Sequence, residues 1–94
     1  MTFEIGDTFS FETPDNNGKM RNRDWMMIVK ESKEGYHVKF FAVKKGLLRP
    51  DSDEEWDIVY DKKDLLEMRE NKGIRRVSAE RVAKAMLHGY VERF

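Results

Sequence analysis

Hydrophobic residues alternate with polar ones in the first part of the chain, which is the pattern of half-buried β-strands. Apolar side chains occupy odd positions in residues 3–11, and a Gly-Asp pair at 6–7 interrupts the series. Residues 25–29 are all apolar, and a second apolar-rich run covers residues 36–43. The alternation predicts one bent strand or two short strands in 3–11, and the two runs predict an antiparallel β-hairpin.

Residues that favour turns separate these segments. Residues 13–19 contain Pro14, Gly18 and several Asp and Asn residues, which predict a loop. Residues 31–35 predict the charged turn that closes the hairpin. Residues 47–50 are expected to lead away from the sheet into an exposed acidic loop at 51–55, and residues 56–60 predict a further short strand.

The hydrophobic period changes to that of an α-helix beyond Tyr60. Residues 61–72 carry the apolar spacing of a short helix, with Asp61 near its start and Gly73 suited to end it. Residues 74–77 predict a last short strand. Ser78 is suited to cap the N-terminus of a final helix.

The final helix has the strongest pattern in the chain. Its apolar residues recur at helical spacing and are Ala79, Val82, Ala83, Met86, Leu87, Tyr90, Val91 and Phe94. Charged residues occupy the other face, so this apolar stripe is expected to be buried against the sheet. If its last residues extend past the sheet edge, the same stripe would form a homodimer or partner contact.

Together these elements predict an α+β fold. Residues 1–94 are expected to form a single domain, with a β-rich part at 1–60 and a helical part at 61–94. The expected architecture is a small antiparallel β-sheet, or an SH3-like partial barrel, of about four to five strands. The C-terminal amphipathic helix covers it, and a short helix precedes that helix.

A bend at Ile5-Gly6-Asp7, followed by a hairpin that begins near Trp25, resembles the start of a small SH3-like barrel. The resemblance covers about half of the chain and implies a fold, not a function. Composition adds a further likeness. A small, Cys-free and highly charged stand-alone domain is typical of the accessory proteins of phages and mobile elements.

Composition narrows the class of protein further. Apolar residues make up 39% of the chain, which is enough for one modest core, and the chain contains no Cys. The first eleven residues lack the apolar run of a signal peptide, and no stretch approaches the ~20 apolar residues that span a bilayer. We therefore expect a cytoplasmic protein without a membrane partner.

Charge is balanced overall, with 18 basic and 18 acidic residues, but it is segmented along the chain. Residues 17–50 carry nine Lys or Arg and three acids, whereas residues 51–57 carry five acids and no base. A sheet surface with basic and aromatic side chains is a common way to bind single-stranded nucleic acid. The basic residues of that alternative are Arg21, Arg23, Lys39, Lys44, Lys45 and Arg49.

The competing interpretation places most aromatic residues in the core. In it, Trp25 lies inside together with the even-numbered Tyr36, Val38 and Phe40, and the lysines are solvated. Phe41 falls on the opposite face of its strand. Either both faces of the sheet are covered, or Phe41 is exposed and marks a binding surface.

No residue pattern predicts a catalytic, metal or cofactor site. His37 and His88 are the only histidines and have no metal-ligand spacing, and the sequence contains no phosphate-binding glycine loop. The acids at 51–57 lack the central Gly of a calcium loop. A small enzyme that uses a carboxylate with His37 or His88 is the third hypothesis, and no cofactor is expected.

The leading hypothesis is therefore a non-enzymatic binding module, a regulator or inhibitor that binds another protein. The acidic loop would meet a basic partner, and Phe41 would mark the adjoining surface. The expected partner-binding residues are Asp51, Asp53, Glu54, Glu55 and Phe41.

Overall fold

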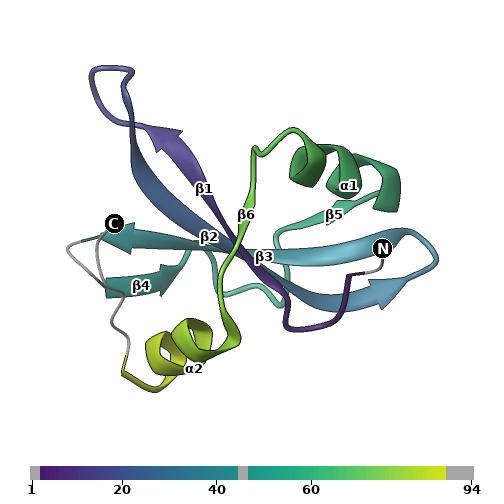
Figure 1. The fold of residues 1–94 in the computed structure, drawn as a ribbon. Helices are drawn as coiled ribbons and strands as arrows, with labels where there is room; N and C mark the ends of the chain where they lie inside the picture. The colour runs from purple at the N-terminus through teal and green to yellow at the C-terminus, as the bar shows by residue number, and fades with distance from the viewer. Residues whose placement is uncertain (1–2, 45–46, 89–94) are drawn as a thin grey trace.

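The computed structural model describes residues 3–44 and 47–88, and within them all side chains except those of residues 21–23, 44 and 88. It has an α+β fold with an antiparallel sheet and two helices (Figure 1). The elements are β1 (Thr8–Pro14), β2 (Met20–Ser32), β3 (Gly35–Lys44), β4 (Leu47–Pro50), β5 (Ile58–Tyr60), α1 (Lys62–Glu70), β6 (Arg75–Arg76) and α2 (Ala79–His88).

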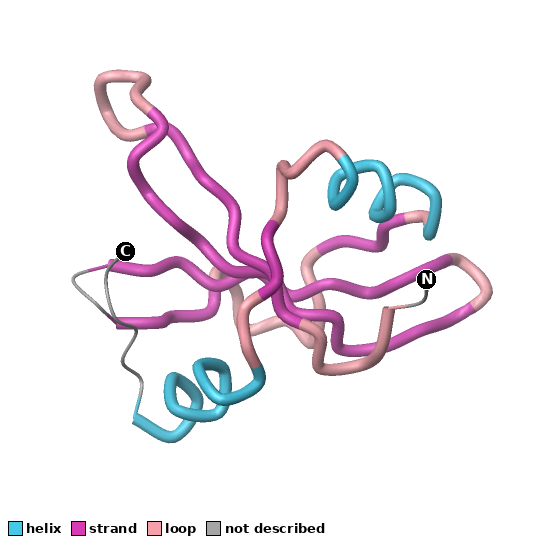
Figure 2. The backbone as a smooth tube through the Cα atoms, in the orientation of Figure 1, coloured by secondary structure: helices cyan, strands magenta, loops and turns pink. Residues whose placement is uncertain are grey.

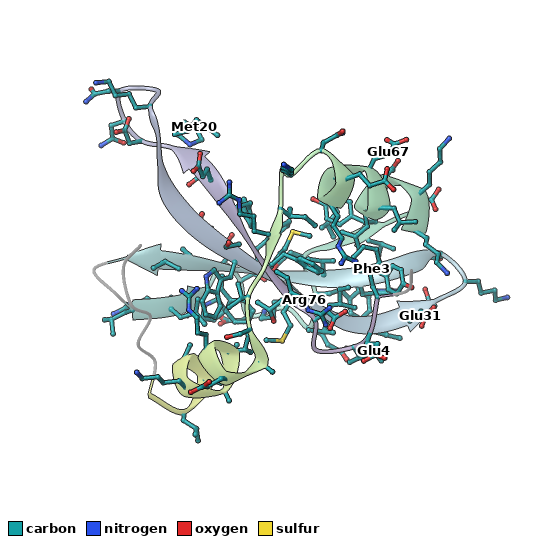
Figure 3. All side chains as sticks on the ribbon, in the orientation of Figure 1. Phe3, Glu4, Met20, Glu31, Glu67 and Arg76 are labelled. Carbon is teal, nitrogen blue, oxygen red and sulfur yellow. The ribbon has the colours of Figure 1, made fainter. Side chains whose placement is uncertain are left out.

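The six strands form one sheet with the order β4-β3-β2-β1-β6. β5 also pairs with β3, at residues 36–38. It lies on the same edge of β3 as β4, which pairs with residues 41–44. The hairpin of β1 and β2 extends away from the rest of the sheet (Figure 2), and Met20 lies near its tip (Figure 3). The sheet therefore has a meander of three long strands at its centre and short strands at its edges.

The ladder between β2 and β3 contains a β-bulge. The register shifts between Ile28 and Lys30, which leaves Val29 without a partner in the ladder. Because the bulge adds one residue to β2, the side chains of β2 before Val29 lie on the opposite face of the sheet from the one that an unbroken ladder would give them. Beyond the bulge, Trp25 therefore pairs with Phe41.

Trp25, Tyr36 and Val38 are buried, as the core interpretation predicts, and Phe40 is half-buried, but Trp25 lies on the opposite face of the sheet from the other three. Trp25 belongs to the α2-side cluster, in which Trp25, Val77 and Ala85 are buried and Phe41, Val43, Leu48 and Val82 pack around them. The other sheet face carries the α1-side cluster, whose buried members are Phe3, Phe9, Met26, Ile28, Tyr36, Val38, Leu65 and Ile74. Phe41 is half-buried and packs in the α2-side cluster.

Helix α1 begins and ends as its sequence directs, with one difference. Asp61 is the N-cap, and its side chain accepts a hydrogen bond from the Lys63 amide. At the other end the amides of Lys72 and Gly73 donate to carbonyl oxygens of the last turn, which is the Schellman arrangement. Lys72, with φ 61°, takes the left-handed conformation that was predicted for Gly73.

Other boundaries also differ from the sequence prediction. Residues 47–50, predicted to lead away from the sheet, form β4. The predicted strand at 56–60 begins only at Ile58, which leaves Trp56 in the preceding loop. Residues 4–7 form a turn, in which the Asp7 amide donates to the Glu4 carbonyl (3.0 Å), so the first strand begins at Thr8.

Helix α2 packs against the sheet with Val82, which belongs to the predicted stripe, and with Ala85, which lies outside it. Ser78 caps it as expected, since its hydroxyl oxygen accepts from the Arg81 amide (3.3 Å). Ala85 is buried and Val82 packs beside it, whereas Ala79, Ala83, Met86 and Leu87 of the predicted stripe are exposed. Tyr90, Val91 and Phe94 lie outside the described residues. No helix within the described part of the chain has the length and apolar character needed to cross a membrane.

Candidate functional site

The acidic loop, residues 51–57, interrupts one edge strand of the sheet. It leaves β4 and enters β5, and both strands pair with β3. The Asp51 amide still donates to the Phe40 carbonyl (3.0 Å), and the Asp57 amide donates to the Val38 carbonyl (2.9 Å). The hydrogen-bonded pairing with β3 therefore continues before and after the loop, and the chain leaves the sheet only between these two points.

Asp57 closes the gap that the loop leaves in the ladder. One carboxylate oxygen accepts the Phe40 amide (2.7 Å), and the other accepts the Ser52 hydroxyl. These hydrogen bonds, from Ser52 and then from Phe40, together with the nearby Lys39 ammonium, hold the pKa of the Asp57 carboxyl below its usual value. Asp57 thus joins the start and the end of the loop.

Lys39 is the second anchor. Its ammonium group donates to the carbonyl oxygen of Ser52 (2.9 Å) and to that of Glu54. A single cation therefore binds two backbone carbonyls of the most acidic segment in the chain. Hydrogen bonds from an ionised donor are stronger than those between neutral groups, so Lys39 fixes the path of this backbone.

Trp56 is the third anchor. Its ring meets the buried His37 ring edge to face, with 4.5 Å between centroids, and the Lys30 ammonium lies 5.2 Å from the Trp56 ring centroid. His37 is held in turn, because its Nε2 atom lies 2.8 Å from the Ser32 hydroxyl oxygen. Loop, β2 and β3 are joined at this point by packing and by a cation–π contact.

The three anchors leave the remaining acids of the loop in solvent. Asp51, Asp53, Glu54 and Glu55 are all exposed. The backbone that carries them is tied down at Ser52, Glu54 and Asp57, so the carboxylates project from a constrained loop. These are the acids that the sequence predicted to contact a partner. Phe41 is set apart from them by its burial in the α2-side cluster.

Of the six basic residues of the nucleic-acid alternative, the structure describes the side chains of Lys39 and Arg49. Lys39 is bound to the acidic loop, and Arg49 is exposed on β4. The side chains of Arg21, Arg23 and Lys44, and the whole of Lys45, lie outside the described residues. Trp25 and Tyr36 are buried, so neither presents a ring face for stacking in this conformation.

Sequence reasoning missed the residues that hold the loop. Lys39 was counted as a basic surface residue, and Lys30 was assigned no role. The one available signal is the alternation in β3, which places His37 and Lys39 together on the face away from Val38. That signal does not reveal that a loop more than ten residues further along the chain covers this face.

We expect Asp57→Asn to loosen the loop in a pH-dependent way. The charged Asp57 accepts both hydrogen bonds, so the variant should lower the free energy of unfolding by about 1 kcal/mol at neutral pH. Because the folded-state pKa lies below the usual 3.8, the native contribution is complete above that value. It is lost as the pH falls through the folded-state pKa.

Urea denaturation of both proteins at a series of pH values measures this difference. The gap between native and variant should be widest near neutral pH and narrow at acid pH. Asp53→Asn, in the same loop but fully exposed, is the matched control and should show almost no gap at any pH. A gap for Asp57→Asn that stays constant with pH would contradict the role given to its charge.

The described residues hold no group of three or more His, Asp or Glu side chains arranged to bind a metal ion. A scan against protein-family models, a search of curated proteins and a search of solved structures each found no match to this chain.

Proposed function

We propose that this chain is a non-enzymatic binding module that presents the acidic loop to a basic surface of a partner protein, as a regulator or inhibitor would. The observation that carries the proposal is the anchoring of the loop. Lys39, Asp57 and Trp56 hold its backbone, while Asp53, Glu54 and Glu55 stay in solvent.

Anchoring matters because a disordered acidic segment would lose conformational entropy when it binds. A loop that already holds its bound shape avoids much of that cost. Exposed charges of one sign also increase the rate of encounter with an oppositely charged surface. Both effects favour recognition of another macromolecule over a role for these acids in solubility alone.

The nucleic-acid alternative receives less support. Acidic carboxylates repel phosphates, and the acidic loop lies beside Lys39 on the hairpin surface that the alternative requires. The buried Trp25 and Tyr36 are also not placed to stack on bases. We therefore propose a protein partner with basic side chains.

We also propose that the sheet is a partly open SH3-like barrel. The support comes from β2, which is shared between the strand sets β6-β1-β2 and β2-β3-β4 and carries the bulge at Val29. Val82 and Ala85 of α2 pack with Leu48 of β4 and Val77, which follows β6, so the helix joins the two ends of the strand order. An experimental structure in which α2 lies away from β4 would count against this barrel.

Charge neutralisation in the loop tests the proposed function. The chain, immobilised and exposed to nuclease-treated lysate, supplies a captured protein that is then purified for binding measurements. We expect Asp53→Asn, Glu54→Gln and Glu55→Gln together to weaken its binding by about tenfold, since each exposed ion pair contributes about 0.2–1 kcal/mol. Added salt should weaken the native complex more than the variant complex.

The matched control neutralises three exposed acids elsewhere: Glu34→Gln, Glu67→Gln and Glu70→Gln. This control carries the same net charge as the loop variant and should bind the partner nearly as tightly as the native chain. Equal weakening by both triple variants would show that only net charge matters. That result, or unchanged binding by the loop variant, would refute the proposal.

A further inference from the structure

Helix α2 exposes the apolar stripe that its sequence was expected to bury. Met86 and Leu87 have 46% and 80% of their surface exposed, and Ala79 and Ala83 are exposed beside them. The helix contacts the sheet instead through Ala85 and Val82. Figure 1 shows α2 at the periphery of the molecule, away from α1.

The exposed stripe is compact and is centred about 120° around the helix from Val82 and Ala85, the residues that contact the sheet. At about 100° per residue, its four side chains fall within an arc of about 100°. Ala85 lies about 160° from Ala83 around the same helix. A helix packed through one face thus presents a second, apolar face to water, which is the usual mark of an interaction surface.

The order of side-chain sizes along the stripe selects one kind of occupant. The small residues, Ala79 and Ala83, occupy the first half, and the large ones, Met86 and Leu87, occupy the second half. Two such helices packed antiparallel place the large side chains of one over the small side chains of the other. A parallel pair would oppose large to large and leave a gap between the alanines.

The charges beside the stripe agree with this arrangement. Glu80 and Lys84 lie on the same flank of α2, four residues apart. In an antiparallel pair related by a two-fold axis, a flank faces the same flank of the second copy. An axis at the level of Val82 therefore places Glu80 of each copy opposite Lys84 of the other. Measured along the helix axis, Ala79 of one copy then lies about 1.5 Å from the level of Met86 in the second copy.

We propose that two copies of this chain associate through the exposed stripe of α2. The two helices are antiparallel, and the two-fold axis that relates them crosses α2 at the level of Val82 along its length. The interface uses a surface separate from the acidic loop and does not depend on the proposed function. A helix of ten residues is about 15 Å long, so the contact is small and the dimer is weak and concentration-dependent. The apolar series continues in the sequence at Tyr90, Val91 and Phe94, outside the described residues.

Sedimentation analysis of the full chain from about 10 µM to about 1 mM tests this proposal. The native chain should shift from one copy to two within that range. Leu87→Glu should weaken association at least about tenfold, because it buries a carboxylate against the other helix. Ile5→Glu changes another exposed apolar residue, in the turn before β1, and should leave association unchanged.

Charge reversal tests the antiparallel register itself. Glu80→Lys and Lys84→Glu should each weaken the dimer by about threefold or more, since each places like charges across the axis. The double variant restores opposite charges and should associate like the native chain. All of these positions are exposed, so each variant is expected to keep its fold, which circular dichroism of each variant would check.

Three outcomes would overturn the proposal. The native chain could remain a monomer at every concentration, Leu87→Glu could associate as well as the native chain, or the double charge variant could fail to recover. The last result would show that the copies meet in some other orientation.

Discussion

Gly35→Ala should cost about 3–5 kcal/mol, which is a large share of the stability of a domain of this size. Gly35 begins β3 with φ 135°, a conformation that residues with a side chain rarely adopt. A Cβ at this position would overlap the Tyr60 carbonyl oxygen and lie 3.2 Å from the Asp61 Cα. These are backbone atoms where β5 meets α1, so they cannot swing aside as a side-chain end would.

Gly18→Ala separates backbone strain from steric overlap. Gly18 also has a positive φ, at 80°, but no atom lies within 4 Å of the added methyl group. This variant should cost only about 1 kcal/mol. Urea denaturation of both variants gives the comparison, and equal costs would mean that the backbone at Tyr60 yields to the new side chain.

Trp25→Ala should cost about 3–5 kcal/mol, the range for removing a large buried aromatic side chain. Trp25 is fully buried at the centre of the α2-side cluster, where Phe41 and Val82 pack around it. Its loss would leave a cavity between the sheet and α2. The measurement is again the free energy of unfolding, obtained from urea denaturation followed by far-ultraviolet circular dichroism.

The matched comparison is Trp56→Ala. Trp56 is only half-buried, and its contacts are the His37 ring and the Lys30 ammonium. We expect a cost of about 1–2 kcal/mol, because less apolar surface returns to water. If Trp56→Ala destabilised the chain as much as Trp25→Ala, the acidic loop would be part of the core and not an excursion from it.

Local signals predicted most of the elements of this fold. The apolar runs located β2 and β3, the turn residues located the loops, and Ser78 caps the helix that it was expected to cap. Asp61, which was expected near the start of its helix, is the N-cap of α1. These features depend on residues within about one turn of each other. They are therefore visible in the sequence without knowledge of the rest of the chain.

The face occupied by Trp25 depended on a single residue. Ser32 pairs with Gly35 at the turn, so an unbroken ladder would pair odd residues of β2 with even residues of β3. Trp25 would then share a face with Tyr36. The bulge at Val29 reverses this parity, and nothing in the apolar run 25–29 distinguishes the residue that bulges.

The acidic residues of the candidate site could be predicted from the sequence, but the contacts that anchor their loop could not. The acids of the loop stand out as a run of charge, whereas their anchor Lys39 lies in another strand and resembled a nucleic-acid contact. The direction of α2 was missed for a related reason. An amphipathic pattern shows that a helix has an apolar face, but it does not show whether the sheet or a second chain covers that face.

The way the acidic loop joins the sheet also bears on how such a protein can change over generations. The β3 edge is paired before and after the loop, and Asp57 and Lys39 tie the loop to that edge by side-chain hydrogen bonds. Substitutions at residues 53–55 therefore leave both hydrophobic clusters untouched. A lineage under pressure to follow a changing target can vary these positions freely, because new specificity there carries little penalty in folding.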